Sequence, residues 1–186
     1  MKRLFLAIKV IPDHNLLKIY HAMQQSFRYD KIRWVDPINF HLTLKFFGNT
    51  SEEKIPIISE VVQNVLKPYD PLNLVLENCG VFGSRYKPRV IWLGIANNNQ
   101  LKNLGIELLN DLHDAGFIKD RQNFVPHITV GRITKIIDKR LFNEEMSKIK
   151  DVFHQQIIFD RIILFESVLS STGPQYNVIK SFPLNG

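Results

Sequence analysis

Two short stretches of the sequence each place a histidine and a threonine two residues apart among aliphatic residues. They read FHLTL from residue 40 and PHITV from residue 126, so that His41 and Thr43 correspond to His127 and Thr129. Successive side chains of a β-strand point to opposite faces. Each stretch therefore predicts a half-buried strand that presents an imidazole and a hydroxyl on the face away from the core.

Two imidazoles that face one another are suited to proton transfer. Histidine has an ordinary pKa of about 6.5, so it both donates and accepts a proton near neutrality. A pair can serve as general acid and general base in one displacement. Attack of water on a phosphodiester needs both, with donors to the charged phosphate oxygens between them. Thr43 and Thr129 would supply these donors.

Each of these residues also has a purely structural interpretation. A single strand histidine is more often a surface or hydrogen-bonded core residue than a catalyst, and threonine favours strands in any case. It is the repetition of His-x-Thr that favours catalysis. A zinc site would need three or four ligands at defined spacing, and H-x-x-x-H, H-x-H and C-x-x-C do not occur, so we predict no metal. The remaining histidines are interpreted as surface residues: His14, His21, His113 and His154.

The two stretches belong to an alternating series of strand-like and helix-like segments. Strand-like runs rich in Val, Ile, Leu and Phe span 3–11, 39–48, 72–82, 89–96, 123–133, 155–167 and 175–182. Apolar residues at helical spacing predict helices at 13–29, 51–66 and 98–115, with a weaker candidate at 137–149.

One offset relates the two halves of this series. Arg3 begins an apolar run 38 residues before His41, and Arg89 begins a similar run 38 residues before His127, so the unit recurs at an offset of 86. Self-similarity at a fixed offset is the signature of internal duplication. Two related halves packed face to face would bring the two His-x-Thr strands to opposite sides of one cleft.

Length and composition limit the classes of protein that fit. The 186 residues, 45% of them hydrophobic, suffice for one compact domain or for two small lobes that share a core. Lys and Arg exceed Asp and Glu by 24 to 18, which favours an anionic partner without identifying it. Cys79 is the single cysteine, which excludes an intrachain disulfide and suits a reducing cytoplasm. The apolar run near the start is too short to span a bilayer, so we expect no targeting segment and no membrane.

The two stretches and their flanks resemble a known family. FHLTLKFFG and FVPHITVGR are similar to the paired HxTx motifs of the 2H phosphoesterase superfamily, within it the LigT-like RNA 2′,3′-cyclic phosphodiesterases, historically named 2′-5′ RNA ligases. RLFLAIKVIP, IRWVDPINFHLTLKFFG, FGSRYKPRVIWLGI and LFESVLSSTGPQYNVIKSFPL resemble further segments of the family, so the resemblance covers nearly the whole chain. One HxT match is weak, whereas two in order with these flanks are specific. Phe47 departs from the aliphatic residue more usual in the family.

The resemblance implies an α+β fold over 1–186, internally duplicated, with two antiparallel-sheet lobes flanked by helices around a central cleft. It implies that the two histidines open a 2′,3′-cyclic phosphate at an RNA end to leave a 2′-phosphate, with His41 as proton donor, His127 as proton acceptor and no cofactor. Some members of the family also join or cleave 2′-5′ linkages. A phosphodiesterase for small cyclic nucleotides or for ADP-ribose cyclic phosphate would use the same residues, and a non-catalytic RNA-binding module is a further alternative. We expect a cytoplasmic monomer.

Three further residues are candidates for substrate contact. By resemblance, Arg132 matches a phosphate-contacting arginine and Tyr176 a tyrosine near the cleft. Strict alternation would put Arg132 on the core face, so this prediction requires a bulge at Gly131, and the alternative is an arginine that ends the strand at the surface. Phe124 would either stack on a terminal base or pack in the core.

Basic residues outside the motifs allow two interpretations. Lys45 lies on the His41 face by alternation, where it would meet phosphate or be solvated. Arg85, Lys87 and Arg89 would track an RNA backbone or form a solvated loop.

Overall fold

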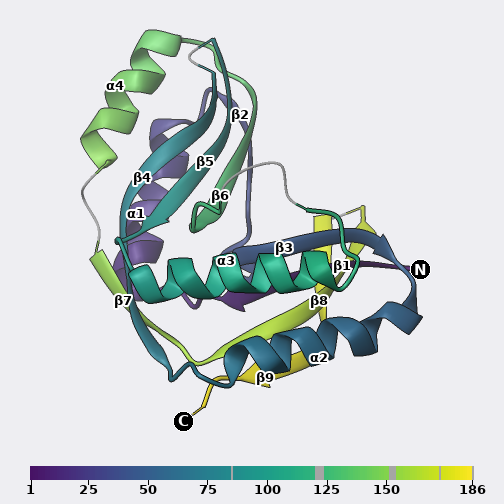
Figure 1. Ribbon diagram of the computed structural model, residues 1–186. Coiled ribbons are helices and arrows are strands. Elements are labelled where there is room, and N and C mark those ends of the chain that lie inside the picture. The colour runs from purple at the N-terminus through teal and green to yellow at the C-terminus, as the bar shows by residue number, and fades with distance from the viewer. Residues whose placement is uncertain (85, 120–123, 151–153, 172, 186) are drawn as a thin grey trace.

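The computed structural model describes every residue except 85, 120–123, 151–153, 172 and 186. In the described part, nine strands form one antiparallel sheet in the order β7-β4-β5-β6-β3-β1-β8-β9, and β2 pairs with β6 (Figure 1). The strands are β1 (Lys2–Lys9), β2 (Lys31–Trp34), β3 (His41–Thr50), β4 (Leu72–Ser84), β5 (Lys87–Ile95), β6 (His127–Lys135), β7 (His154–Phe159), β8 (Arg161–Ser170) and β9 (Gly173–Pro183). The helices are α1 (His14–Ser26), α2 (Ile55–Leu66), α3 (Asn99–Asp114) and α4 (Lys139–Ile149), with 3₁₀ turns at Pro37–Asn39 and Glu52–Lys54.

The two His-x-Thr strands meet at the centre of the sheet. There β3 and β6 run antiparallel and are joined at one pair, Leu42 with Ile128. On one side lie β3, β1, β8 and β9, which we call the first lobe; on the other lie β6, β5, β4 and β7 with β2, the second lobe. The predicted two-lobed α+β fold is confirmed, and the two lobes form a single sheet.

The structure also shows the duplication. The order β1, α1, β3 recurs as β5, α3, β6, and the first residues of β3 and β6 are the two histidines themselves. In the first lobe β1 lies between β3 and β8, and in the second β5 lies between β6 and β4. The same element therefore occupies the same place in each lobe.

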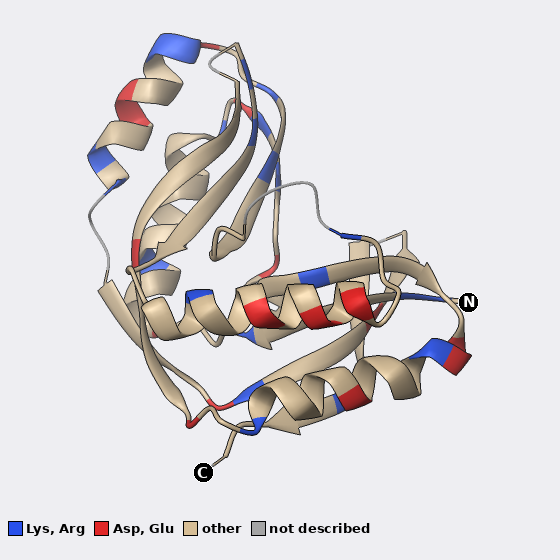
Figure 2. Cartoon of the chain, in the orientation of Figure 1, with Lys and Arg blue, Asp and Glu red and all other residues tan. Residues whose placement is uncertain are grey.

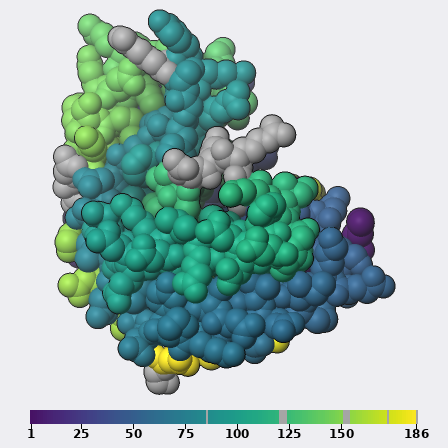
Figure 3. Space-filling view, viewed as in Figure 1, coloured from purple at the N-terminus to yellow at the C-terminus, as the bar shows by residue number. Residues whose placement is uncertain are grey.

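The helices are exchanged between the lobes. Helix α1 follows β1 of the first lobe, yet Phe27 at its end lies 4.9 Å from Phe142 of α4 and stacks near Trp34 of β2. Helix α3 follows β5 of the second lobe but packs beside α2 and β3. Figure 3 shows α3 and α2 side by side on the near face of the first lobe. Each lobe is thus covered partly by a helix from the other repeat.

The sheet separates a large core from a small apolar cluster. Along β1, Leu4 and Leu6 point into the large core that the helices cover, whereas Phe5 and Ala7 alternate with them on the other face. Phe5 and Ala7 pack there with Ile163 and Phe165, and Tyr176 lies against this small cluster. This second face is the one on which the motif histidines lie.

Two features of the strand order differ from the prediction. Residues 31–34 form β2, which the sequence did not predict because four residues before Pro37 give too short a pattern. The run at 155–167 is two strands, β7 and β8, separated at Asp160 and placed in different lobes. The apolar pattern continues across Asp160, so it does not show that the pairing partner changes. No helix in the described part of the chain is long and apolar enough to cross a membrane.

Candidate active site

The four motif residues lie on two adjacent strands. Because Leu42 pairs with Ile128, continuing this antiparallel register by one residue sets His41 opposite Thr129 and Thr43 opposite His127. All four are half-buried, and the aliphatic residues between them are buried. Diagonal neighbours in such a register lie about 7 to 8 Å apart, and their Cβ atoms somewhat closer. A phosphate-sized group placed between the strands is therefore within reach of both imidazoles.

Both imidazole rings are held by the same backbone contact. Nδ1 of His41 lies 2.6 Å from the carbonyl oxygen of Asn39, and Nδ1 of His127 lies 2.7 Å from that of Val125. A carbonyl oxygen only accepts, so each Nδ1 carries a proton and donates it. Nε2 is then a base in the neutral ring and an acid in the cation. The contact fixes which nitrogen of each ring exchanges the catalytic proton.

Aromatic rings support each imidazole from within its own lobe. Phe5 and Tyr176 lie 5.1 and 5.3 Å from the His41 ring, and Phe82 lies 4.7 Å from the His127 ring. Phe82 in turn stacks on a neighbouring tryptophan of β5, at 5.2 Å. The sequence predicted Tyr176 but not the other aromatic residues, because contacts between strands distant in sequence have no local pattern.

The environment of His41 disfavours its charged form. Burial lowers the pKa of His41 first, the positive charges of Arg132 and His127 lower it further, and the hydrogen bond to Asn39 opposes these effects. Burial raises the pKa of Tyr176, against the influence of Arg132 and a second arginine in β1. Arg132 and His127 are thus close enough for their charges to act on His41, and Tyr176 contacts its ring.

Matching bulges follow the two motifs. In the pairing of β1 with β3, Leu6 pairs with Lys45 and Ala7 with Thr43, so Leu44 is an extra residue in β3. In the pairing of β5 with β6, Ile91 pairs with Gly131, and the next residue, Trp92, pairs with Thr129. Val130 is therefore an extra residue in β6. The predicted bulge near Gly131 is thus present. Arg132 is exposed beyond it rather than facing the core.

The bulge in β3 overturns one interpretation from the sequence. Lys45 does not lie on the His41 face, since it is 4% exposed and its Nζ donates to the carbonyl oxygen of Ile118 at 2.6 Å. Gly131 occupies the equivalent place in β6, where an added Cβ would lie 3.0 Å from Ile32. Two residues in succession turn inward at each bulge, which simple alternation does not predict.

The remaining candidates pack on the core, lie exposed on β5 or fall outside the described residues. The ring of Phe124 lies against Gly105 of α3 and packs on the large core, which favours the core interpretation. Lys87 and Arg89 are exposed on β5, and Arg85 lies outside the described residues.

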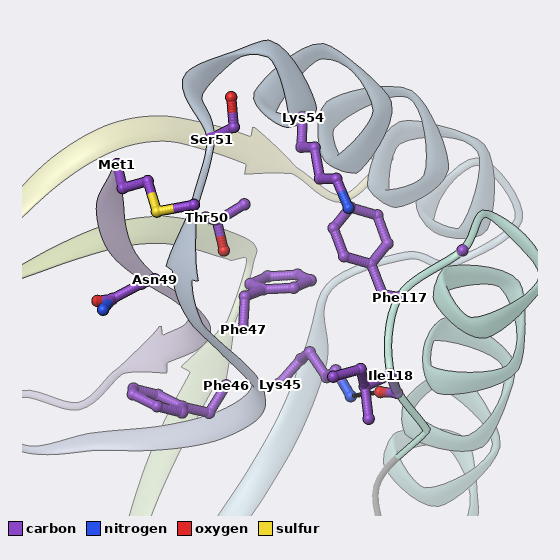
Figure 4. A pocket seen from close by; sticks show the side chains of 11 residues that line it. Met1, Lys45, Phe46, Phe47, Asn49, Thr50, Ser51, Lys54, Phe117 and Ile118 are labelled. Atoms are coloured by element: carbon purple, nitrogen blue, oxygen red, sulfur yellow. Dashed lines mark hydrogen bonds between the residues drawn. The ribbon is translucent and has the colours of Figure 1, made fainter.

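Two cavities flank the central strands. One, of about 220 Å³, opens at the end of β3 between Phe47, Lys54 and Phe117 and includes neither motif histidine (Figure 4). The other, of about 290 Å³, is lined by residues that include Trp92 and Val125 and lies beside the start of β6. The first lies on the helix-covered side of the β3 bulge.

The chain is similar in sequence and in fold to several known proteins. Residues 10–92 match the family model described as LigT like phosphoesterase. The chain is 36% identical over 180 residues to an RNA 2′,3′-cyclic phosphodiesterase of Methanocaldococcus jannaschii, an alignment that covers 97% of this chain and 99% of that protein. A protein of the same name from Aquifex aeolicus is 35% identical, with coverage of 83% and 82%. The crystal structure of E. coli LigT complexed with 3′-AMP aligns with a TM-score of 0.78 at 25% identity and covers 100% of this chain and 99% of that one.

Proposed function

The chain belongs to the family of LigT-like phosphoesterases, and on this premise we propose that it hydrolyses the 2′,3′-cyclic phosphate at an RNA end to a 2′-phosphate. The observation that carries the proposal is the central pairing of the two His-x-Thr strands, with each Nδ1 bonded to a backbone carbonyl. The relatives named RNA 2′,3′-cyclic phosphodiesterase support the choice of substrate.

The proposed reaction moves two protons, one at each histidine. Nε2 of neutral His127 takes a proton from water as the water oxygen attacks phosphorus. The bond from phosphorus to O3′ breaks, and Nε2–H of His41 gives its proton to O3′. A 2′-phosphate and a free 3′-hydroxyl result. Thr43, Thr129 and Arg132 donate to the phosphate oxygens as negative charge develops there.

The surroundings of His41 would make its protonation depend on the substrate. In the free protein burial and Arg132 lower the pKa of His41, so its ring tends to be neutral. A phosphate bound between His41 and Arg132 offsets the charge of the arginine and favours the imidazolium ion. His41 would therefore gain its proton as the anionic substrate enters.

Three alternatives retain the same site residues. A small cyclic nucleotide or ADP-ribose cyclic phosphate would occupy the same phosphate position. In 2′-5′ ligation a 5′-hydroxyl would attack phosphorus in place of water, with the same proton transfers at the two histidines. A non-catalytic RNA-binding module would retain the fold without turnover. The exposed basic residues of the second lobe, which include Lys87 and Arg89, favour a polyanion over a mononucleotide.

The test is incubation with an RNA that ends in a 2′,3′-cyclic phosphate, with the product identified by mass and by sensitivity to phosphatase. We expect a 2′-phosphate, formed equally well in EDTA. His41→Ala and His127→Ala should each reduce turnover about a hundredfold or more, since a general acid or base contributes at least that much. Undiminished turnover in both variants would refute the assignment of these residues, and no turnover by the unaltered protein would favour the binding module.

A further inference from the structure

An arginine that the sequence analysis did not single out lies directly across from Arg132. Strand β2 pairs with the far half of β6, and in this register Arg33 is the partner of Arg132. The backbone N–H of Val35 extends the pairing with a bond of 2.9 Å to the carbonyl oxygen of Val130. Two arginines thus form a directly opposed cross-strand pair.

Both side chains project from the same face of the sheet. Ile32 and Trp34 pack against the large core, so alternation puts Arg33 on the other face. Arg132 follows the buried Gly131 and is exposed, as Arg33 is. This is the face that carries the histidine and the threonine of the second motif.

The pair is electrostatically unfavourable as it stands. Like charges directly opposite one another on neighbouring strands destabilise a sheet. No carboxylate forms an ion pair with either arginine in the part of the chain that the structure describes. Figure 2 shows further Lys and Arg along the strands of this lobe. An anion bound between the two guanidinium groups would remove the repulsion.

Strands β3 and β2 follow one another along the same edge of β6, because β5 occupies the other edge. Strand β3 pairs with β6 at Ile128, and from Gly131 onward β6 pairs with β2 instead. Continued by one residue, the first pairing places His41 between Ile128 and Arg132 along this edge. Arg33 therefore lies beyond His41, in line with it beside β6.

The position of the pair indicates which anion it would bind. Arg132 follows His127 by five residues, roughly 15 Å of strand, and its charge influences both His41 and Tyr176. Its guanidinium group is thus near enough to His41 to act on the reacting phosphate, and Arg33 lies level with it on the neighbouring strand. An RNA that enters the site with its cyclic phosphate at the histidines would bring its next phosphate upstream to this pair of arginines.

We propose that Arg33, with Arg132 beside it, binds the phosphodiester that joins the last two nucleotides of the RNA. This inference rests on the proposed function and gives it a substrate class: an RNA end of at least two nucleotides rather than a mononucleotide. A guanidinium group presents several N–H donors in a planar fork that matches phosphate oxygens. Arg132 would then contact both the reacting phosphate and the upstream one, and Arg33 the upstream one.

A purely structural role for Arg33 makes a different prediction. Strand β2 is an edge strand that pairs with β6 alone in the described part of the chain, and charged residues on edge strands prevent association with other sheets. That role would make Arg33→Gln prone to aggregate without altering the preference between substrates. The preference between substrates therefore separates the two roles.

The experiment compares kcat/KM for two substrates that differ in the upstream phosphate. One is a nucleoside 2′,3′-cyclic phosphate, and the other is a dinucleotide that ends in the same cyclic phosphate. Arg33→Gln should reduce kcat/KM for the dinucleotide about tenfold or more, the effect of losing a charged hydrogen bond, and should leave the mononucleotide nearly unchanged. Arg140→Gln is the matched control, since Arg140 is an exposed arginine on α4 paired with Glu144 and its loss should leave both values unchanged.

A second arm uses the unaltered protein, so it does not depend on how the variant folds. A methylphosphonate at the upstream linkage removes its charge, and it should reduce kcat/KM about as much as Arg33→Gln does. The two changes combined should cost little more than either alone, because they remove the same interaction. Equal loss on both substrates, full additivity, or an unchanged ratio with aggregation alone would overturn the proposal. Failure of every cyclic phosphate to react would instead refute the proposed function itself.

Discussion

At the scale of single residues, the two histidines have equivalent backbone contacts and different neighbours. Each Nδ1 donates to the carbonyl two residues before it. His41 lies against Phe5 and Tyr176, whereas His127 lies against Phe82. The near symmetry of the motifs does not assign acid and base, so any division of labour comes from these neighbours.

The proposed assignment of His41 as the acid predicts selective rescue by a better leaving group. A cyclic phosphate with sulfur in place of O3′ needs little protonation as its bond to phosphorus breaks. It should therefore restore His41→Ala at least about tenfold more than His127→Ala, because a general acid usually contributes more than that. The measurement is the rate of release of the thiol for both variants. Equal rescue, or rescue of His127→Ala alone, would reverse the assignment and keep the two-histidine mechanism.

The lowered pKa of His41 predicts a dependence of stability on pH. Burial is the first cause of the lowered pKa, and a histidine in an unfolded chain has a pKa of about 6.5. Since the folded pKa is lower, the folded state binds fewer protons than the unfolded state below that value. The contribution of the neutral His41 ring to the free energy of unfolding is present above about pH 6.5. It is lost as the pH falls through the pKa of the folded state. Urea unfolding from about pH 7 down to about pH 5 should show a shallower loss of stability for His41→Gln than for the unaltered protein, and equal slopes would contradict this.

At the scale of elements, the exchange of helices connects the two lobes. Phe27 is 2% exposed and joins α1 of the first repeat to α4 of the second, with ring centroids 4.9 Å apart. Phe27→Ala should lower the free energy of unfolding by about 3 to 5 kcal/mol, the usual cost of removing a buried phenylalanine. Tyr29→Ala is the control two residues away, because Tyr29 is 68% exposed, and it should cost less than about 1 kcal/mol. Similar losses in both variants would show that this helix contact is not specific.

At the scale of the whole molecule, the single sheet and the exchanged helices predict one cooperative unit. The lobes meet at one strand pair, Leu42 with Ile128, but each is covered by a helix from the other repeat. Both tryptophans, Trp34 and Trp92, lie in the second lobe, so their fluorescence reports on that lobe while far-ultraviolet circular dichroism reports on both. The two signals should give coincident midpoints in urea. Separate midpoints would show that the lobes unfold independently.

Local periodicity accounts for the features that could be predicted from the amino-acid sequence. Alternation of apolar and polar residues placed both His-x-Thr motifs on the face away from the core, and the offset of 86 set the order of strands and helices in both repeats. These patterns are local because side-chain direction within a strand or helix follows from backbone geometry alone. They sufficed to predict the two histidines and the two-lobed fold.

Features that depend on pairing between distant segments were decided by the tertiary structure. The bulge at Leu44, which the sequence analysis did not predict, turns Lys45 into the core. The bulge at Val130 was predicted only because the family resemblance placed Arg132 in the site. Pairing with β6 sets Arg33 opposite Arg132, although Arg33 lies in a four-residue strand that has little pattern of its own. A bulge or a cross-strand partner is fixed by hydrogen bonds to another strand. Alternation along one segment cannot specify it, because the partner strand lies far away in the sequence.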